Sequence, residues 1–325
     1  MQSPRSKNAT SAKPGHRWTQ FSVRTLLLFI TVIGVWLAIE TNCANRQRRA
    51  VAAITKLGGT VGYDYAPLDP TVDAGLYSGQ RSDSPPPQHL VRLLGEHYFI
   101  EVVAAHFQAC PSLNDDDLGC LAGLSKIQTV VLQGTQVSDS GLEKLRHLRS
   151  LKNLDLRGTH VSGRGLSHIS GAAKLFYLGL AGQQVDDGGL EHIEKFTTLE
   201  NLEIVNASIT DSGLSSLAKL KGLKRLTIRE SHEFTDAGLI HLKQLSRLER
   251  LQLGGTEITD EGLAYLRGLT KLRSLSLNDT NVSDAGLIHL ECLPSLKSLY
   301  LKGTRVTTSG AARLQKSLPN CDISR

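Results

Sequence analysis

The sequence repeats one leucine-rich pattern from Ile127 to its C-terminus. The common pattern is LxxLxLxGTxV[ST]DxGLxxLxxLxx, and its period is 24 residues except in one unit of 25. A partial copy, LNDDDLGCLAGLSK, precedes the first full unit. Repetition at a fixed period of this length is typical of chains that stack similar supersecondary units. The units begin at Ile127, Leu151, Leu175, Leu199, Leu223, Leu248, Leu272 and Leu296.

Each unit combines two hydrophobic periodicities. LxxLxL indicates a short strand, whereas GLxxLxxL, with apolar residues three apart, indicates a helix. The intervening Ser/Thr-Asp pair is predicted to cap that helix, because its hydroxyl or carboxylate can accept N–H groups of the first turn. A unit is therefore a strand, a turn, a capped helix and a return loop. One unit cannot bury both leucine faces alone, but stacked units can.

The packing distances of the two elements predict the shape of the stack. Neighbouring strands lie about 4.8 Å apart, whereas packed helices need about 8–10 Å. A stack with strands on one side and helices on the other must therefore bend. The sequence predicts an α/β solenoid shaped as a horseshoe, with a parallel sheet on its concave face and helices on its convex face.

The repeat resembles the leucine-rich repeat over about residues 103 to 325. Its [ST]-D-x-G-L signature is similar to the ribonuclease-inhibitor-like and F-box-associated classes of that family. The family usually carries Asn or Cys at the pattern's Thr position, where the side chain hydrogen-bonds the turn. Gln183, Ala207 and Ser231 replace Thr in three units, so the resemblance implies that the series of these turn contacts is interrupted in the middle of the stack. The threonines are Thr135, Thr159, Thr256, Thr280 and Thr304.

The N-terminal region contains one uncharged apolar run, TLLLFITVIGVWLAI, at residues 25–39. As a helix it spans roughly 22 Å, short of the ~30 Å hydrocarbon core, but Arg24 can snorkel and extend it. We expect an uncleaved single-pass anchor. A cleaved signal peptide stays open as the alternative, although no good cleavage site follows the run, and a buried core helix is the third possibility.

The segments around this run resemble the front end of membrane-anchored leucine-rich-repeat proteins of planctomycete bacteria. The resemblance rests on FSVRTLLLFITVIGVWLAI, RQRRAVAAITKLGGTVGYDY and LVRLLGEHYFIEVV. It implies a location at the inner (cytoplasmic) membrane and an architecture, but no reaction. Five Lys/Arg precede the run and four follow it closely, which favours a cytoplasmic N-terminus and extracytoplasmic repeats.

Composition shifts divide the chain into five predicted segments. A basic tail (1–20) is followed by the transmembrane anchor (21–43). A juxtamembrane helix, a short strand and a Pro-rich loop fill 44–88, and an N-terminal cap with the degenerate repeat fills 89–126. Eight repeats with a C-terminal cap occupy 127–325. The caps are expected because a solenoid otherwise exposes its end leucines.

Motifs for chemistry are weak. The net charge of +6 comes without a dense basic block, so no nucleic-acid partner is expected. The five cysteines lack zinc or disulfide-framework spacing. KLGGTVG stands in the wrong order for a phosphate loop, and NDDDL lacks the spaced ligands of a calcium loop. No nucleophile motif occurs, so we expect no enzyme, cofactor or metal. His168, His192, His241 and His289 share one pattern position, but adjacent helices are too far apart for a zinc site.

The candidate binding site lies on the strands. Residues at pattern positions 3, 5 and 7 should point off the sheet into the hollow, since strand side chains alternate. In the middle of the stack they form a small apolar patch with acids on one side and arginines on the other, and aromatic and Arg residues are common anchors for protein partners. The candidate residues are Asp155, Arg157, Tyr177, Ala181, Glu203, Val205, Arg225, Arg229 and Arg250.

Three functions fit these features. The leading hypothesis is a non-enzymatic, membrane-tethered module that binds a protein or peptide on the concave sheet. The alternative is a structural, envelope-organising protein that self-associates. The F-box-associated resemblance suggests a third, a ubiquitin-ligase-type substrate adaptor, but an apolar run replaces the F-box helices here.

Overall fold

The computed structural model describes residues 23–63, 101–108 and 110–325. The expected basic tail, the Pro-rich loop and the first part of the expected N-terminal cap, residues 89–100, lie outside the described residues. The chain divides into two compact units, Met1–Asn42 and Cys43–Arg325. Each unit is described by itself below.

The first unit contains the start of helix α1 (Val23–Lys56). Its apolar side chains, including Leu28, Phe29 and Trp36, are exposed. The Thr31 and Thr41 hydroxyls donate to backbone carbonyls three or four residues earlier, so both are satisfied within the helix. The helix is long and apolar enough to cross a membrane, a property that signal sequences share. Anchor and juxtamembrane helix, expected as two segments, form one continuous helix.

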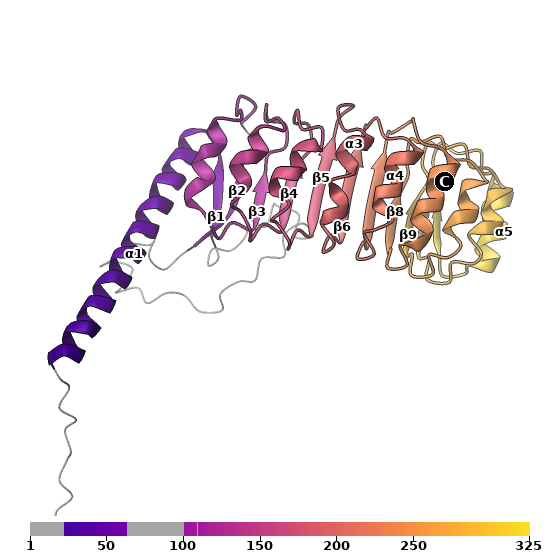
Figure 1. Ribbon diagram of the computed structural model, residues 1–325. Helices are drawn as coiled ribbons and strands as arrows, with labels where there is room; N and C mark the ends of the chain where they lie inside the picture. Colours follow the sequence, from indigo (N-terminus) through magenta and orange to yellow (C-terminus); the bar gives the residue numbers. More distant parts are fainter. Residues whose placement is uncertain (1–22, 64–100, 109) are drawn as a thin grey trace, which may run out of the picture. The chain divides into compact units, whose positions relative to one another are not determined.

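The second unit is built on an 11-stranded sheet whose strands follow chain order (Figure 1). All neighbours are parallel except β1 and β2, which pair antiparallel at the N-terminal end. Helical segments lie on one side of this sheet (Figure 1). The strands are β1 (Thr60–Tyr63), β2 (Val102–His106), β3 (Thr129–Val131), β4 (Asn153–Leu156), β5 (Tyr177–Ala181), β6 (Asn201–Val205), β7 (Arg225–Arg229), β8 (Arg250–Gln252), β9 (Ser274–Ser276), β10 (Ser298–Tyr300) and β11 (Asp322–Ser324).

Equivalent positions of successive repeats pair across the sheet. Leu154 pairs with Leu178 and Leu178 with Leu202, so the leucines at pattern position 4 form one buried row. This row, the leucines at positions 1 and 6 and the helical leucines form one continuous core. The predicted α/β solenoid with parallel strands is therefore confirmed.

The predicted helical segments are present in the repeats. Most of them are 3-10 helices, a type that the prediction of a helix did not specify. The spacing of Leu142, Leu145 and Leu148 agrees with this type, because apolar residues three apart match the three residues per turn of a 3-10 helix. The segments are η2 (Asp117–Gly123), η3 (Gly141–Leu145), η4 (Arg164–Ile169), α3 (Asp187–Leu190), η5 (Ile193–Lys195), α4 (Asp211–Leu217), η6 (Asp236–Gln244), η7 (Gly262–Leu266), η8 (Gly286–His289) and α5 (Thr308–Ser317).

The Ser/Thr-Asp pair connects neighbouring repeats. As predicted, the Thr210 hydroxyl caps its own helix by accepting from the Ser212 N–H. The Asp187 carboxylate instead accepts from the Thr210 N–H and hydroxyl, at 2.8 and 2.6 Å. The expectation that the Asp also caps its own helix is wrong here, because its carboxylate is used by the following repeat. Equivalent contacts join Asp115 to Ser138, Asp139 to Ser162, Asp211 to Thr235, Asp236 to Thr259, Asp260 to Ser283 and Asp284 to Thr307.

This aspartate ladder is interrupted at one step. Gly163 stands where the pattern has Asp, and Asp186 stands where the next repeat has Ser or Thr. Asp186 caps the Gly189 N–H and forms an ion pair with Arg164 at 2.7 Å. An aspartate at 163 would face the like charge of Asp186, so the two departures from the pattern belong together.

The pattern's threonines bind within their own repeat. The Thr135 hydroxyl donates to the Leu132 carbonyl, and the other four threonines do the same three residues back. The turn contact implied by the resemblance is present where Thr occurs. Ser231, one of the departures, accepts from the Ala207 N–H of the preceding repeat.

Both ends of the solenoid are covered. At the N-terminal end, Ile54 of α1 and Phe107 are fully buried in the common core. Helix α1 ends at Lys56, and Gly58 has a φ of 84°, so the GG dipeptide acts as the helix stop. At the C-terminal end, α5 is followed by β11, a strand that the sequence analysis does not identify.

Candidate binding face of the sheet

The strand face is the side of the sheet formed by pattern positions 3, 5 and 7. Its exposure increases along the chain. On β7 and β8 the side chains of Arg225, Arg229 and Arg250 are exposed, as the sequence predicts. On β3 to β5 the side chains at positions 3 and 5 are buried, although they belong to the same face. Neighbouring side chains contact one another in this part; the Asn153 amide, for example, donates to the Thr129 hydroxyl.

Four of the candidate residues form one closed network on β4 to β6. Arg157 binds Asp155 with two hydrogen bonds, at 2.9 and 2.7 Å, and donates a third to Glu203 at 3.0 Å. The Tyr177 hydroxyl donates to the second oxygen of Glu203 at 3.2 Å. The Asp155 side chain is 5% exposed, so its charge is largely removed from water and is neutralised by Arg157.

Gly179 makes room for this network. It lies between Asp155 and Glu203 in the sheet register. A Cβ at residue 179 would stand 2.7 Å from the Tyr177 hydroxyl and 3.0 Å from the Asp155 carboxylate. The glycine is therefore needed for the close approach of these side chains, a role that was not predicted.

Two groups of the network, Arg157 and Tyr177, have a raised pKa. The bidentate contact with Asp155 raises the pKa of Arg157. Burial, and then the charges of Asp155 and Glu203, raise the pKa of Tyr177, so its hydroxyl stays protonated and donates. These four side chains bind one another, so their charged and polar groups already have partners within the network.

The three arginines beyond the network differ from Arg157. Within the described part of the chain, no ion pair or side-chain hydrogen bond of Arg225, Arg229 or Arg250 is found. Arg225 and Arg250 are direct neighbours in the register of β7 and β8. Their guanidinium donors are therefore available to an outside acceptor.

Ala181 and Val205 pair across β5 and β6, and Val205 pairs in turn with Arg229. They line one side of a hollow of about 340 Å³ whose wall also includes Arg157 and Glu203. The structure thus brings together all the predicted candidate residues on, or directly after, five adjacent strands, β4 to β8. They form two parts. One is the closed network, and the other is the three exposed arginines; the apolar residues Ala181 and Val205 lie beside both.

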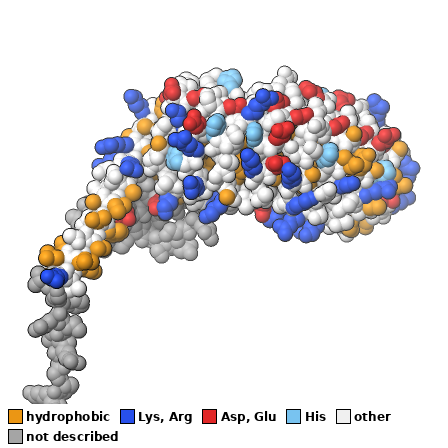
Figure 2. Space-filling model, in the orientation of Figure 1, with side chains coloured by type: hydrophobic (Ala, Val, Ile, Leu, Met, Phe, Trp, Pro, Cys, Tyr) orange, Lys and Arg blue, Asp and Glu red, His pale blue; other side chains and the backbone are white. Residues whose placement is uncertain are grey.

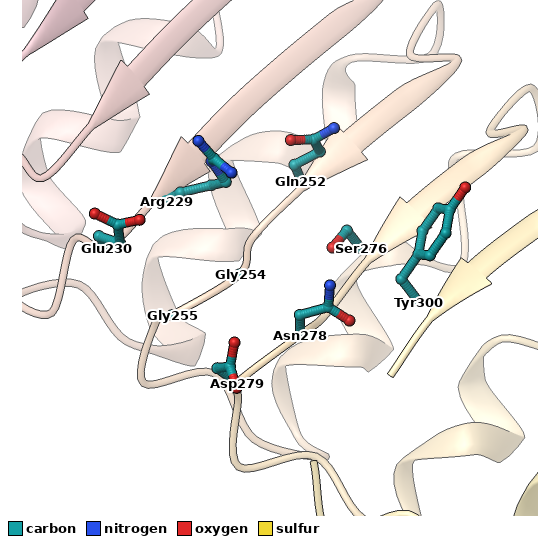
Figure 3. A pocket seen from close by; sticks show the side chains of 9 residues that line it. All are labelled: Arg229, Glu230, Gln252, Gly254, Gly255, Ser276, Asn278, Asp279 and Tyr300. Carbon is teal, nitrogen blue, oxygen red and sulfur yellow. The ribbon is translucent and has the colours of Figure 1, made fainter. Parts of the chain in front are cut away.

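A second hollow was not predicted. It holds about 350 Å³ and extends from Arg229 across the strands that follow. Figure 3 shows that Arg229, Gln252, Ser276 and Tyr300 come from four successive strands, β7 to β10. Gln252, Ser276 and Tyr300 share one pattern position, and the signal that could have identified them is the pair of small residues at Gly254 and Gly255 beside them.

The other sequence motifs lie elsewhere. In the described residues, no group of three or more His, Cys, Asp or Glu side chains could hold a metal ion. The acids of NDDDL are used in the turn, where Asp117 accepts from the Asn114 N–H and Asp115 begins the ladder. His289 contacts Arg267 on the helical side. That side carries acidic and basic side chains interspersed (Figure 2).

The comparisons with known proteins agree with the fold. The family model described as "Leucine Rich repeat" matches residues 244–266 and 268–290. An internalin of Listeria monocytogenes is similar with a TM-score of 0.56 and 26% identity, over 66% of this chain and 58% of the internalin. Internalin C2 of the same organism gives a TM-score of 0.47 and 24% identity, over 65% of this chain and 84% of that one.

A leucine-rich-repeat protein of Leptospira interrogans gives a TM-score of 0.44 and 19% identity, over 64% of this chain and 62% of that one. No curated protein matches the chain. The chain spans little more than half the length of the first internalin, so the similarity concerns the repeats. The repeated pattern, the sheet in chain order, the family-model match and the likeness to the first internalin show that the chain carries leucine-rich repeats.

Proposed function

We propose that this protein is a membrane-tethered module that binds a protein or peptide on the strand face of its repeats. Solenoids of this kind present extended surfaces that are typical of protein recognition. The observation that carries the proposal is the group of exposed arginines on β7 and β8, which have no ion pair among the described residues and of which Arg229 lines two hollows.

The strand face is favoured over the helical side for a physical reason. Its backbone is fixed by ladder hydrogen bonds on both sides, and the aspartate ladder fixes each repeat against the next. A surface held in this way loses little conformational entropy when a partner binds. Arg and Tyr residues, which supply most binding hot spots, occur together on it as Arg229 and Tyr300.

The tether is proposed from helix α1. The apolar residues of the run 25–39, such as Leu28 and Trp36, are exposed, and the Thr31 and Thr41 hydroxyls donate to backbone carbonyls of the helix, as a lipid environment requires. The distribution of Lys and Arg supports a cytoplasmic N-terminus and extracytoplasmic repeats. The repeat subclass and the planctomycete-type architecture stay predictions from the sequence.

A peptide selection tests the binding function. The full chain in nanodiscs is presented to a displayed random-peptide library, and the enriched peptides are measured on two variants. Thr227→Trp places a bulky ring in the middle of the strand face, whereas Ser215→Trp places the same ring on the exposed side of α4. We expect the enriched peptides to lose binding to Thr227→Trp and to keep it on Ser215→Trp. Equal binding to both variants, or no enrichment, contradicts the proposal.

A further inference from the structure

We propose that the strand face over β7 and β8 binds an extended acidic segment of a partner protein, with one carboxylate between Arg225 and Arg250 and a second on Arg229. The inference rests on the proposed function and names the chemistry of the partner. It concerns a part of the strand face where positive charge is free, in contrast to the closed network on β4 to β6.

Positive charge without an ion-pair partner lies on only one part of the strand face among the described residues. Arg157, on the N-terminal part of the face, spends its donors on Asp155 and Glu203. Arg225, Arg229 and Arg250 have no such partner among the described residues. Glu203 lines a small hollow with Arg225, but both of its oxygens already accept from Arg157 and Tyr177. Each free guanidinium offers donors in a planar fork that fits a carboxylate.

The sheet register sets the distance between the two anchor points. Arg225 and Arg250 are opposite each other on neighbouring strands, about 4.8 Å apart at the backbone, so one carboxylate can lie between them. Arg229 follows Arg225 by four residues on the same strand, which is about 13 Å. In an extended ligand, side chains at positions i and i+4 point to the same side and are separated by the same distance. The arrangement therefore fits two acids spaced i, i+4.

The hollow beside Arg229 completes the second anchor. Asn278 uses its side-chain oxygen to accept from the Lys302 N–H, which leaves its amide NH₂ as a donor toward the hollow. Gln252 adds another amide on the same wall (Figure 3). Glu230 and Asp279 line the hollow as well, and they repel a carboxylate placed beside them. The acid is therefore held by the Arg229 guanidinium and away from these two carboxylates.

Elsewhere on the repeats, several charges already have partners. Lys219 forms an ion pair with Glu194 on the helical side. The ladder carboxylates, such as Asp211, face hydroxyls and N–H groups of the next repeat. The feature that attracts an acidic ligand to β7 and β8 is the group of three exposed arginines on adjacent strands, for which the described residues supply no ion pair.

Defined peptides test the inference on the full chain in nanodiscs of neutral phosphatidylcholine. Fluorescent, otherwise neutral peptides carry Glu at i and i+4, Glu at i and i+3, or Gln at i and i+4. We expect the i, i+4 Glu peptide to bind most tightly and its binding to weaken as salt rises. Replacement by Gln, or Arg225→Gln with Arg250→Gln, should weaken binding about tenfold or more, since each removes charge-assisted hydrogen bonds.

Arg247→Gln is the matched control, because Arg247 is an exposed arginine in the return loop before β8. It should leave binding unchanged, and the thermal midpoints of all variants should agree because the replaced side chains are exposed. Equal binding of Glu and Gln peptides, equal loss in Arg247→Gln, or no binding of the Glu peptide overturns the inference. The peptides selected from the library separate this inference from the proposed function. If these peptides are neutral, lose binding to Thr227→Trp and bind Arg225→Gln as tightly as the wild type, the strand face binds peptides but the acidic partner is wrong.

Discussion

Asp236 and Thr259 lie 23 residues apart, yet one carboxylate accepts both the N–H and the hydroxyl of the threonine, at 2.9 and 2.5 Å. The same contact recurs between most neighbouring repeats and fails only where Gly163 and Asp186 replace its two members. The ladder fixes each repeat against the next at the end of the strand that leads into the helical segment. It therefore helps to hold the strand-face side chains in a fixed register.

Removing one ladder carboxylate should destabilise the stack. Asp236→Ala leaves the Thr259 N–H and hydroxyl without their partner, which is expected to cost about 2 kcal/mol in the free energy of unfolding. Urea unfolding of the full chain in detergent measures it. Glu291→Ala, at an exposed acid on the helical side, is the control and should change little. Equal effects of the two substitutions would show that the ladder contributes no stability.

The glycine of the DxGL pattern should be coupled to the ladder. A Cβ at Gly262 would overlap the Asp236 carboxylate, whereas a Cβ at Gly119 meets nothing within 4 Å. Gly262→Ala should therefore destabilise the wild type but be tolerated in the Asp236→Ala background. Gly119→Ala should be neutral or stabilising, by about 0.5–1 kcal/mol. A double-mutant cycle gives the coupling energy, and a value near zero contradicts the close approach as the reason for this glycine.

The two kinds of strand-face arginine should respond differently to removal. Arg157→Ala leaves the Asp155 charge in a site that is 5% exposed, so it should cost about 3 kcal/mol of stability. Arg229→Ala removes an exposed side chain without an ion pair and should leave stability unchanged while weakening peptide binding. Thermal unfolding and peptide titration of both variants check this. The reverse pattern would mean that Arg229 is structural and that the network is the binding site.

Acid should weaken the ladder. Burial acts to raise the pKa of Asp115, but hydrogen bonds from Ser138, Ser140 and Gly141 outweigh it and lower the pKa below the usual 3.8. A group with a lowered folded pKa stabilises the fold above its unfolded pKa, and this stability is lost as pH falls through the folded value. The wild type should lose stability below about pH 4, and Asp115→Asn should lose less. Urea unfolding between neutral and acidic pH measures both slopes; parallel curves would contradict the account.

The apolar part of α1 should hold the chain in the membrane. The full chain should stay in the membrane pellet after carbonate extraction, and its intact mass should include residues 25–39. Leu28→Arg with Val32→Arg should release it, because each charge at the bilayer centre costs about 3 kcal/mol, whereas Thr41→Arg, beyond the run, should not. Release of the wild type, or a mature mass that lacks the run, would favour the signal peptide. A reporter fused after residue 60 should be active outside the cytoplasm.

The repeats were predictable because both periodicities are local. The strand starts follow from LxxLxL, and Leu142, Leu145 and Leu148 follow from GLxxLxxL. The helix type was not part of the prediction, although a spacing of three residues already favours the 3-10 form. The contact between Asp187 and Thr210 was not predicted, because Thr210 lies in the next repeat. Within a single repeat, the sequence only suggests that the aspartate caps the helix that follows it.

The sequence predicted which residues belong to the candidate site, but not which of them form ion pairs with one another. The alternation of strand side chains places Asp155, Arg157 and Arg229 on one face. The alternation does not predict which charged side chains form ion pairs, because an ion pair here joins residues that lie two strands apart. Arg157 reaches Glu203, 46 residues away, only because Gly179 leaves the space between them open. The hollow beside Arg229 depends on the same kind of cross-strand fit.

The most direct test of the binding account compares two tyrosines by oxidative footprinting of the full chain, with and without a selected peptide. Tyr300 stands exposed on β10 at the strand face, and Tyr265 stands half-exposed on η7 at the helical side. The account predicts that the peptide protects Tyr300 and leaves Tyr265 unchanged. Protection of Tyr265 with no change at Tyr300 would contradict it.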